Sequence, residues 1–445
     1  MAQPSKGRLL PRDVTKQYPK IVRGEGVYIY DNTGKRYLDA TSGIAVVNIG
    51  HGRAEVVKAL ATQAQTISYL TSVLFDNEPV HQLAERVGRL TPEGLNNTYF
   101  VSGGSEATET AIKLARQYHY ERGETTRHLM ISRWQSYHGN TVGALSVSGL
   151  VGRRDKYTPY LLPFPHIAEC NCYRCPFNRT YPSCGILCAY GLEVAIKHAG
   201  PKNVSAFIAE PIVGAAAGAI TPPPEYFRII RDICDKYGTL FIADEVITGF
   251  GRTGKNFGIE HWNVIPDIII SAKGLSGGYV PLGAVIAHDK VREMFVKAGV
   301  PFVHGYTMVS NPLAAAVGVA VLEILEKERL VARVASLEEG FFNRGRVLLK
   351  HRVIGDVRGK GLLMGIEIVK DKQTKETFPP SLRANAKLAS ICLKRGLAIY
   401  PGGGTADGLN GDHFLLCPPF TITEAELDEV FKILEEALVE FESGF

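Results

Sequence analysis

Two short apolar segments of the chain each end in a side chain that could do acid–base or nucleophilic chemistry. Residues 239–243, TLFIA, are followed by Asp244, and residues 267–271, DIIIS, are followed after one alanine by Lys273. In a parallel sheet, groups just past the carboxyl ends of neighbouring strands face one crevice, so the carboxylate and the amine are expected to face each other. An amine desolvated in such a crevice has a lowered pKa and can form an imine with an aldehyde.

An aspartate opposite such a lysine can keep a pyridine nitrogen protonated, and this pair turns pyridoxal phosphate into an electron sink. The alternative is an ordinary buried salt bridge, which is more common for an isolated aspartate and lysine. Two further segments favour the chemical interpretation. Residues 101–110, VSGGSEATET, place a turn before a helix expected over residues 107–120, and its first amides, aided by Ser105, can hold a phosphate. Residues 136–139, SYHG, offer Tyr137, whose ring could stack on a pyridine or fill the core.

The central part of the chain alternates between short apolar runs and helical patterns. Strands are expected at residues 98–102, 128–132, 204–209, 239–243 and 268–271. Such runs, separated by amphipathic segments, indicate an α/β architecture in which helices cover both faces of a buried, largely parallel sheet.

The two ends of the chain have a different character. Long helical patterns cover residues 311–327, 329–350, 380–395 and 423–441, around short strands such as residues 361–369. Residues 27–40, with an Asn-Thr-Gly-Lys turn, indicate a hairpin that should pack with the C-terminal part. We therefore expect an N-terminal segment (1–60), a large domain with a mostly parallel mixed sheet (61–328) and a smaller α+β domain (329–445).

Composition excludes several classes of protein. The 445 residues are 45% hydrophobic and 21% charged, which excludes disorder and coiled coils. The net charge of +5 comes without a basic run, so nucleic-acid binding is not expected. The most apolar stretch without a charge, residues 313–322, is far shorter than the ~20 residues that span a bilayer. Residues 1–20 contain no apolar segment of a secretory signal, so a cytoplasmic location is expected.

Six segments occur together in the order and with the spacing of a known family. They are SGGSEATET (102–110), SYHGNT (136–141), AEPIVGAAAG (209–218), IADEVITGFGRTG (242–254), SAKGLSGGYVPLG (271–283) and HGYTMVSNPLAAA (304–316). Over about residues 27–419 the chain resembles the class III aminotransferases, the ω-aminotransferase group of fold-type I pyridoxal-phosphate enzymes. The resemblance implies their α/β fold, pyridoxal 5'-phosphate as cofactor, and active sites shared across a homodimer, which could pair further into a tetramer.

The resemblance also implies roles for the motif residues. Lys273 would form the internal aldimine and carry the proton between substrate and cofactor, and Asp244 would pair with the pyridine nitrogen. Val246 and Tyr137 would press on the two faces of the ring. Gly104 and Ser105 would hold the phosphate, and Thr307 would reach the phosphate of the neighbouring subunit. Two residues, His138 with an orienting or packing role and Glu210 with a supporting one, complete the implied site.

Four positions depart from the family pattern. Asn140 and Ala215 replace an arginine and a glutamate of the 4-aminobutyrate branch, which argues against 4-aminobutyrate, ornithine and acetylornithine as the best donors. Ala45 replaces a tryptophan that narrows the pocket of amine:pyruvate enzymes. Gly408, in DGLNGDH, stands where those enzymes carry a mobile arginine. Another arginine or a different geometry must therefore hold the carboxylate of a 2-oxoacid.

The expected function is transfer of an amino group from an ω-amine or another primary amine to a 2-oxoacid, above all pyruvate, through Lys273. A racemase or epimerase on the same fold and a 4-aminobutyrate-type aminotransferase are the alternatives. A catalytically silent homologue that acts as a binding subunit is disfavoured, because Lys273 and Asp244 are both present.

Five of the eight cysteines crowd into one segment, at Cys170, Cys172, Cys175, Cys184 and Cys188. The spacing C-x-C-x2-C-x8-C-x3-C is compatible with a four-thiolate zinc or iron–sulfur site. Transamination needs no metal, and the alternative is a surface insertion with reduced or paired cysteines. No metal ligand is therefore assigned, and a structural metal stays an open question.

Overall fold

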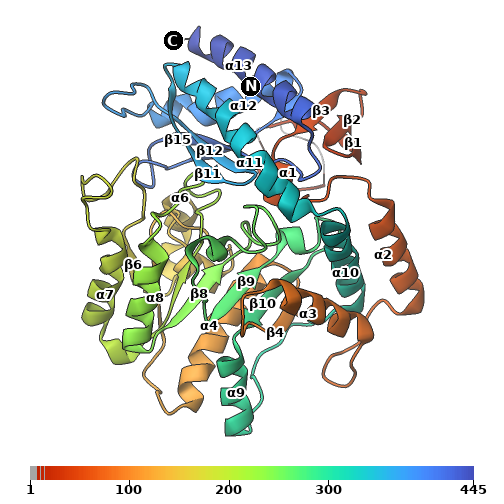
Figure 1. Ribbon diagram of the computed structural model, residues 1–445, viewed down its shortest axis with the longest axis vertical. Coiled ribbons are helices and arrows are strands. Elements are labelled where there is room, and N and C mark those ends of the chain that lie inside the picture. Colours follow the sequence, from red (N-terminus) through yellow and green to blue (C-terminus); the bar gives the residue numbers. More distant parts are fainter. Residues whose placement is uncertain (1–7, 11, 15, 445) are drawn as a thin grey trace.

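The computed structural model describes residues 8–10, 12–14 and 16–444, so the expectation for residues 1–20 lies partly outside the described residues. The described strands form three sheets (Figure 1). The largest has the order β4 (Asn97–Val101), β10 (Gly283–Ala287), β9 (Ile268–Ser271), β8 (Leu240–Asp244), β7 (Val204–Ala209), β5 (Leu129–Arg133) and β6 (His166–Ile167). Neighbours from β9 to β6 pair in parallel, whereas β10 is antiparallel to β4 and β9. The mostly parallel mixed sheet is confirmed.

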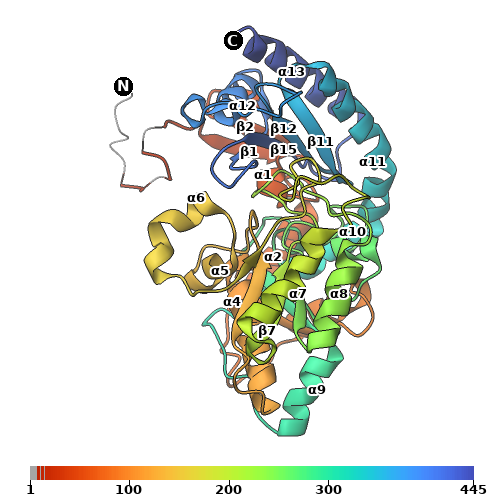
Figure 2. The same cartoon turned by 90° about the vertical axis from the view of Figure 1, so that its left-hand side faces the viewer.

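Alternating side chains of this sheet face two separate layers of helices. On β7, Ala206 and Ile208 belong to the hydrophobic cluster that includes α4 (Gly104–Glu121), while Phe207 packs in the cluster of α7 (Leu187–Ala199) and α8 (Tyr226–Tyr237). Figure 2 shows α4 on one side of the sheet and α7 and α8 on the other. Because both faces are covered, the strands are apolar throughout.

The C-terminal part has its own sheet, with the order β11 (Ile354–Lys360), β12 (Leu363–Ile368), β15 (Asp412–Leu416) and β14 (Tyr400–Gly403). It lies above the seven-stranded sheet in Figure 1, covered by α11 (Leu330–Val347), α12 (Ala384–Lys394) and α13 (Glu424–Glu442). The N-terminal strands join this part of the molecule. The sheet β1 (Ile21–Glu25), β2 (Tyr28–Asp31), β3 (Arg36–Asp39) is completed by β13 (Leu397–Ala398), which pairs in parallel with β3.

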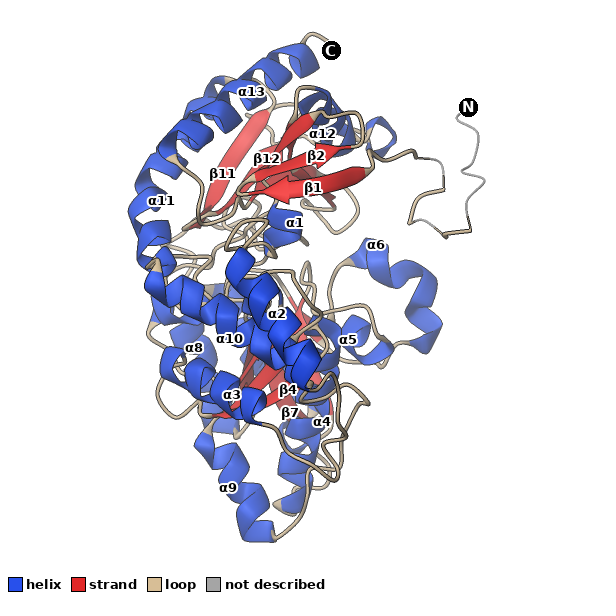
Figure 3. Cartoon of the chain, turned by 90° about the vertical axis from the view of Figure 1, so that its right-hand side faces the viewer, coloured by secondary structure: helices blue, strands red, loops and turns tan. Residues whose placement is uncertain are grey.

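The remaining helices surround the large sheet. They are α1 (Ser42–Ala45), α2 (Ala54–Thr66), α3 (Glu78–Leu90), α5 (Val142–Val147), α6 (Val151–Arg154), α9 (Asp289–Ala298) and α10 (Pro312–Lys327). The helices α2, α3 and α10 pack against one another beside the sheet (Figure 3). Among the described residues, no helix has the length and apolar character needed to cross a bilayer.

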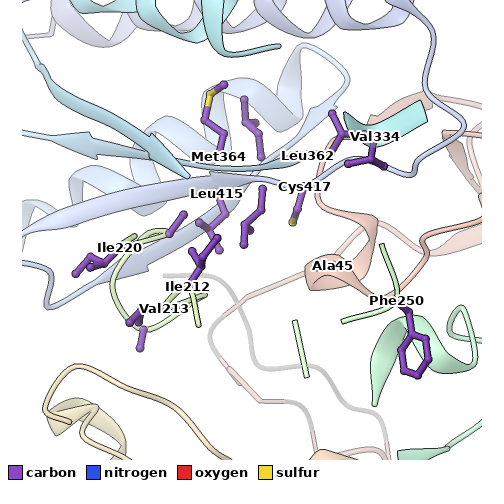
Figure 4. Packing of buried hydrophobic residues seen from close by; sticks show 14 of the residues in the cluster. Ala45, Ile212, Val213, Ile220, Phe250, Val334, Leu362, Met364, Leu415 and Cys417 are labelled. Atoms are coloured by element: carbon purple, nitrogen blue, oxygen red, sulfur yellow. The ribbon is translucent and has the colours of Figure 1, made fainter. Parts of the chain in front are cut away.

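One hydrophobic cluster connects the two sheets. It includes Leu415 of the C-terminal sheet and Ile212 and Val213 of the segment after β7, and Figure 4 shows Leu415 on the face of its sheet that is turned toward these two residues. The C-terminal sheet is therefore packed directly over the end of the large sheet at which β7 and β8 finish. The division of the chain at residues 60 and 328 stays a prediction.

Candidate active site

A cavity of about 460 Å³ lies where the parallel strands β8 and β9 end. Its size suits a small-molecule site. Of the residues expected from the sequence, it is lined by Gly104, Ser105, Tyr137, His138, Glu210, Asp244, Val246 and Lys273. The structure therefore brings together the whole implied cofactor set except Thr307, from segments spread over about 170 positions of the chain.

Asp244 is the last residue of β8 and is held in one orientation. It is 3% exposed, and its Oδ2 lies 2.6 Å from Nδ1 of the buried His138, which must carry the hydrogen. The other carboxylate oxygen, Oδ1, accepts a hydrogen bond of 3.0 Å from the amide of Val246. His138 in turn is fixed by its amide, which donates to Ser148 Oγ at 2.8 Å. The pair places an oriented negative charge on the cavity wall.

Lys273 begins a short turn after β9, and its backbone has a φ of 44°. A lysine in this left-handed region is strained, and such strain is concentrated at functional sites. The residue is partly accessible because it lines the cavity. Burial of the amine lowers its pKa, against the opposing charges of Asp244 and Glu210. Within the described chain Lys273 forms no ion pair, so the ordinary salt bridge that the sequence left open is wrong.

The start of α4 provides a cradle for an anion. The helix begins at Gly104, three residues before the expected start, so the amides of Gly104 and Ser105 belong to its first turn, where no carbonyl of the helix accepts from them. A Cβ on Gly104 would lie 3.3 Å from the methyl groups of Val246. A Cβ on Gly139 would lie 2.7 Å from Ser105 Oγ, the atom that accepts from the amide of Asn140 at 3.1 Å. Glycine at both positions keeps the cradle open.

Glu210 organises the wall that carries Tyr137. Its Oε1 accepts from the amide of Tyr137 at 3.0 Å, and its Oε2 accepts from the amide of Gly214 at 2.8 Å. The side chain is buried, and burial raises its pKa. Tyr137 and Val246 both line the cavity. Glu210 therefore holds the backbone of Tyr137 rather than facing a substrate by itself.

These residues fit pyridoxal phosphate by their donor and acceptor chemistry. A buried carboxylate suits a protonated ring nitrogen, and the first amides of a helix suit a phosphate. The Nε2 atom of His138 is buried without a hydrogen-bond partner in the described structure, so this site has polar capacity that the protein itself does not use. The hydrogen-bonding groups of this cavity and its open space therefore both fit the expected cofactor, pyridoxal phosphate.

Thr307 is not part of this cavity. It is exposed, and its carbonyl oxygen accepts a hydrogen bond of 2.9 Å from Tyr69 Oη. Its position on the surface of one chain leaves its implied role across a dimer a prediction.

The cavity lining also includes polar side chains that the sequence analysis did not single out, namely Arg12, Arg153 and Tyr400. Arg153 lies in α6 and is partly buried, and in the described part of the chain its guanidinium has no carboxylate within ion-pair distance. The neighbouring Arg154 differs, because it donates to the carbonyl oxygens of Leu145, Ser146 and Ser148 at 2.8, 3.0 and 2.6 Å. Neither a strand end nor a position of the family pattern in the sequence pointed to Arg153.

The four departures from the family pattern also have positions in the structure. Asn140 and Ala215 line the cavity, so neutral side chains face it at both places. At the place of the missing tryptophan, Ala45 is buried and its neighbour Ile44 lines the cavity instead. A Cβ on Gly408 would lie 2.7 Å from Val151 Cγ2, so the glycine loop touches the start of α6.

Comparisons with known proteins agree on one family. The family model Aminotransferase class-III matches residues 10–438. The chain is 37% identical to a taurine–pyruvate aminotransferase of Bilophila wadsworthia, over 95% of this chain and 93% of the relative. It is 35% identical to a putrescine–pyruvate aminotransferase of Pseudomonas aeruginosa, over 94% and 90%. The solved structure of an (S)-enantioselective omega-transaminase from Thermomicrobium roseum superposes with a TM-score of 0.91, at 36% identity, covering 98% of this chain and 96% of that one.

Proposed function

Because the chain belongs to the class III aminotransferases, we propose that it transfers the amino group of a primary amine to pyruvate, with pyridoxal phosphate bound in the cavity beside Lys273. The observation that carries this proposal is the amine of Lys273, which lines the same cavity as Asp244 and forms no ion pair with a carboxylate of the described residues. An aminotransferase needs such an uncommitted amine.

The cavity residues that the family resemblance implies have separate roles in this proposal. Asp244 would hold the ring nitrogen protonated, and His138 keeps Asp244 in the orientation that this requires. The amides of Gly104 and Ser105 would hold the phosphate, and Val246 and Tyr137 would contact the ring. When bound, the cofactor supplies the electron sink that makes the substrate's carbon–hydrogen bond acidic.

Lys273 Nζ moves the proton. Since burial lowers its pKa, the amine reaches its neutral form closer to neutral pH than an exposed lysine does. Neutral Nζ can take the proton that the donor's carbon releases and can return a proton at the acceptor's carbon. Asp244 and Glu210 hold the resulting ammonium, because their charges favour the protonated form.

A partly buried arginine on the cavity wall, which forms no ion pair with a carboxylate of the described residues, supports a 2-oxoacid such as pyruvate as the acceptor. Arg153 would bind the carboxylate of pyruvate, and Arg12 supplies a second positive charge at the same cavity. A guanidinium is the side chain best suited to a planar carboxylate. Two relatives are named for aminotransfer from putrescine and from taurine to pyruvate, and neither of these donors has a carboxylate. The neutral Asn140 and Ala215 are consistent with such a donor.

The active form that we propose is a homodimer. Val73, Leu74 and Phe75 are exposed by 87%, 72% and 63%, and their segment is tied to residues 307–310 by hydrogen bonds of Tyr69 and Asn77. Exposed apolar side chains in one segment are typical of a protein interface. A second chain seated there would bring its Thr307 toward this cavity. A tetramer and a cytoplasmic location stay predictions.

The test is a pair of half-reactions followed separately. Purified enzyme loaded with cofactor is mixed with putrescine, freed from the excess amine, and then mixed with pyruvate. We expect about one alanine per chain and a visible absorption band that bleaches in the first step and returns in the second. A racemase or epimerase would form no alanine, and a 4-aminobutyrate-type enzyme would bleach faster with 4-aminobutyrate than with putrescine. Either result would contradict the proposal.

A further inference from the structure

Residues 168–186, which we name the cysteine loop, connect β6 to α7 without a helix or strand of their own. Long connections of this kind inside a compact fold usually have a function. The loop and the first turn of α7 carry Cys170, Cys172, Cys175, Cys184 and Cys188, all as free thiols. All five line one cavity of about 20 Å³, which is room for a single water-sized atom.

The thiols are close enough to influence one another. The pKa of Cys172 is raised to about 11, first by burial and then by Cys170, Cys184 and Cys175. Burial raises the pKa of Cys188 to about 12, with smaller contributions from its cysteine neighbours. Burial therefore favours the neutral thiol at Cys172 and Cys188. A soft divalent cation reverses this, because it binds thiolates and displaces their protons.

A buried positive charge, the guanidinium of Arg133, lies beside the cluster; Glu169 and Glu210 act on it through space, but in the described structure neither forms an ion pair with it. Arg133 is fully buried, and its Nη1 donates to Cys170 Sγ at 3.2 Å. Its Nη2 donates to the backbone oxygen of Glu210, and across the described structure Arg133 forms no ion pair with a carboxylate. A guanidinium away from water is costly unless negative charge is near it. Four thiolates around a divalent cation carry a net charge of about −2, which would meet this need.

We propose that the cysteine loop binds one thiophilic divalent cation of the Zn²⁺ class through Cys172, Cys175, Cys184 and Cys188. Cys172 and Cys175 form a Cys-x-x-Cys pair, which supplies two ligands from one turn. Cys184 and Cys188 supply the other two, and Cys170 is left to Arg133. On binding Zn²⁺, the four thiols lose about four protons to water and four sulfur–metal bonds form, with no oxidant required.

The described chain holds no three His, Cys, Asp or Glu side chains already grouped so that they could bind an ion, so the four thiols must turn inward around the small cavity. The loop can allow this, since Cys172 is exposed and Cys175 and Cys184 are partly exposed. The cation would stiffen a segment that also contacts the C-terminal sheet, through an ion pair between Arg174 and Glu367. Its role is structural, because none of these cysteines lines the cavity of Lys273.

The experiment measures metal in the enzyme as purified with its cofactor, by mass spectrometry of the elements. We expect about one zinc per chain, and less than about 0.1 in a Cys172→Ser/Cys184→Ser double variant. Cys234→Ala, which removes a buried thiol of α8 outside the loop, is the matched control and should keep its metal. Replacement of zinc by Co²⁺ should give the visible bands of tetrahedral cobalt thiolate, a readout that does not depend on turnover.

Three outcomes would overturn the proposal. One is metal that stays below about 0.1 per chain after incubation with Zn²⁺, and another is metal that the double variant retains. The third is a count below the eight free thiols in the unfolded, metal-free protein, because paired cysteines would then occupy the loop. If the double variant fails to fold, Cys175→Ser alone with the cobalt spectrum decides, since one lost thiolate must change the bands.

Discussion

The cavity of Lys273 and the cysteine loop both gather reactive side chains, yet different elements hold them. Asp244 ends one buried strand and Lys273 comes shortly after another, and hydrogen bonds between the neighbouring strands fix where each strand ends. Cys172 and Cys184 lie in turns between β6 and α7. A carboxylate at a strand end is in place before any ligand arrives, whereas thiols on a loop need a ligand to gather them. Changes in the first region should therefore alter turnover, and changes in the second should alter stability.

The largest expected effect separates the two regions directly. Lys273→Ala should lower the rate of alanine formation by about 10⁴-fold or more, because in the proposed mechanism this amine both binds the cofactor and carries the proton. The measurement is the initial rate with saturating pyruvate, together with the cofactor content of the variant. Lys156→Ala, at an exposed position, is the control. A variant that turns over at the original rate would remove the proposed mechanism.

The second effect tests the oriented charge. Asp244→Asn removes the negative partner of a buried pair with His138, a loss of about 3–5 kcal/mol or roughly 10²–10⁴-fold in rate. Initial rates and a titration with pyridoxal phosphate would show whether turnover, cofactor affinity or both decline. Asp155→Asn, at an exposed position, should change neither. An unimpaired Asp244→Asn enzyme would mean that the cofactor does not need this charge.

The third effect concerns the acceptor. Arg153→Ala should raise the KM for pyruvate by about 10- to 100-fold, the usual value of a hydrogen-bonded charged group, while the KM for the amine stays constant. Arg153→Lys should recover part of the loss, and exposed Arg228→Ala serves as the control. A larger rise in Arg12→Ala than in Arg153→Ala would assign the carboxylate to Arg12 instead.

The fourth prediction concerns the cysteine loop. Arg174 is paired there with Glu367, whose side chain is fully buried and also meets Arg358 at 2.7 Å. Arg174→Ala should lower the free energy of unfolding by about 1–3 kcal/mol and leave kcat unchanged. Thermal unfolding and initial rates give both values, with Arg179→Ala of the same loop as an exposed control. A decline in kcat at unchanged stability would mean that the two regions are not separate.

The smallest effect is a pH dependence at the strand that leads into the loop. Burial lowers the pKa of His166 to about 4, so the folded protein keeps it neutral. The free energy of unfolding is unaffected by this group above pH ~6.5. As the pH falls from there toward 4, burial of neutral His166 lowers that free energy by up to about 1.4 kcal/mol per pH unit. The measurement is the free energy of unfolding at pH 7.5 and at pH 5. The decrease between these two pH values should be about 1–2 kcal/mol smaller in His166→Gln than in the original enzyme. Equal differences would mean that other groups set the acid sensitivity.

Much of the cavity could be predicted from the sequence because strand ends fix its chemistry. Once β8 and β9 are parallel neighbours, Asp244 and Lys273 must face one crevice, and the glycine-rich start of α4 follows from the same sheet. Arg12, Arg153 and Tyr400 could not be found this way. They reach the cavity from the N-terminal segment, α6 and β14, and their approach depends on how the C-terminal sheet packs over the large one.

The fold also contains features that the sequence pattern did not predict. The strand β10, GAVIA, has no strong β-branched pattern and was not expected, although it joins β4 to β9. The helical pattern over residues 380–395 is interrupted at Arg383, whose φ of 50° separates a short 3-10 turn, Pro380–Leu382, from α12. Periodicity finds an element, whereas single backbone reversals depend on tertiary contacts.

The pairing of β3 with β13 connects almost the two ends of the chain, with Leu38 opposite Leu397. During synthesis, the first strands made must wait for one of the last before their sheet can close. Tyr400, three residues beyond Leu397, reaches the cavity of Lys273 only after that closure. A chain interrupted before β13 would lack this wall of the cavity, so retention of the proposed cofactor, measured by its visible absorption band, would report complete synthesis and folding.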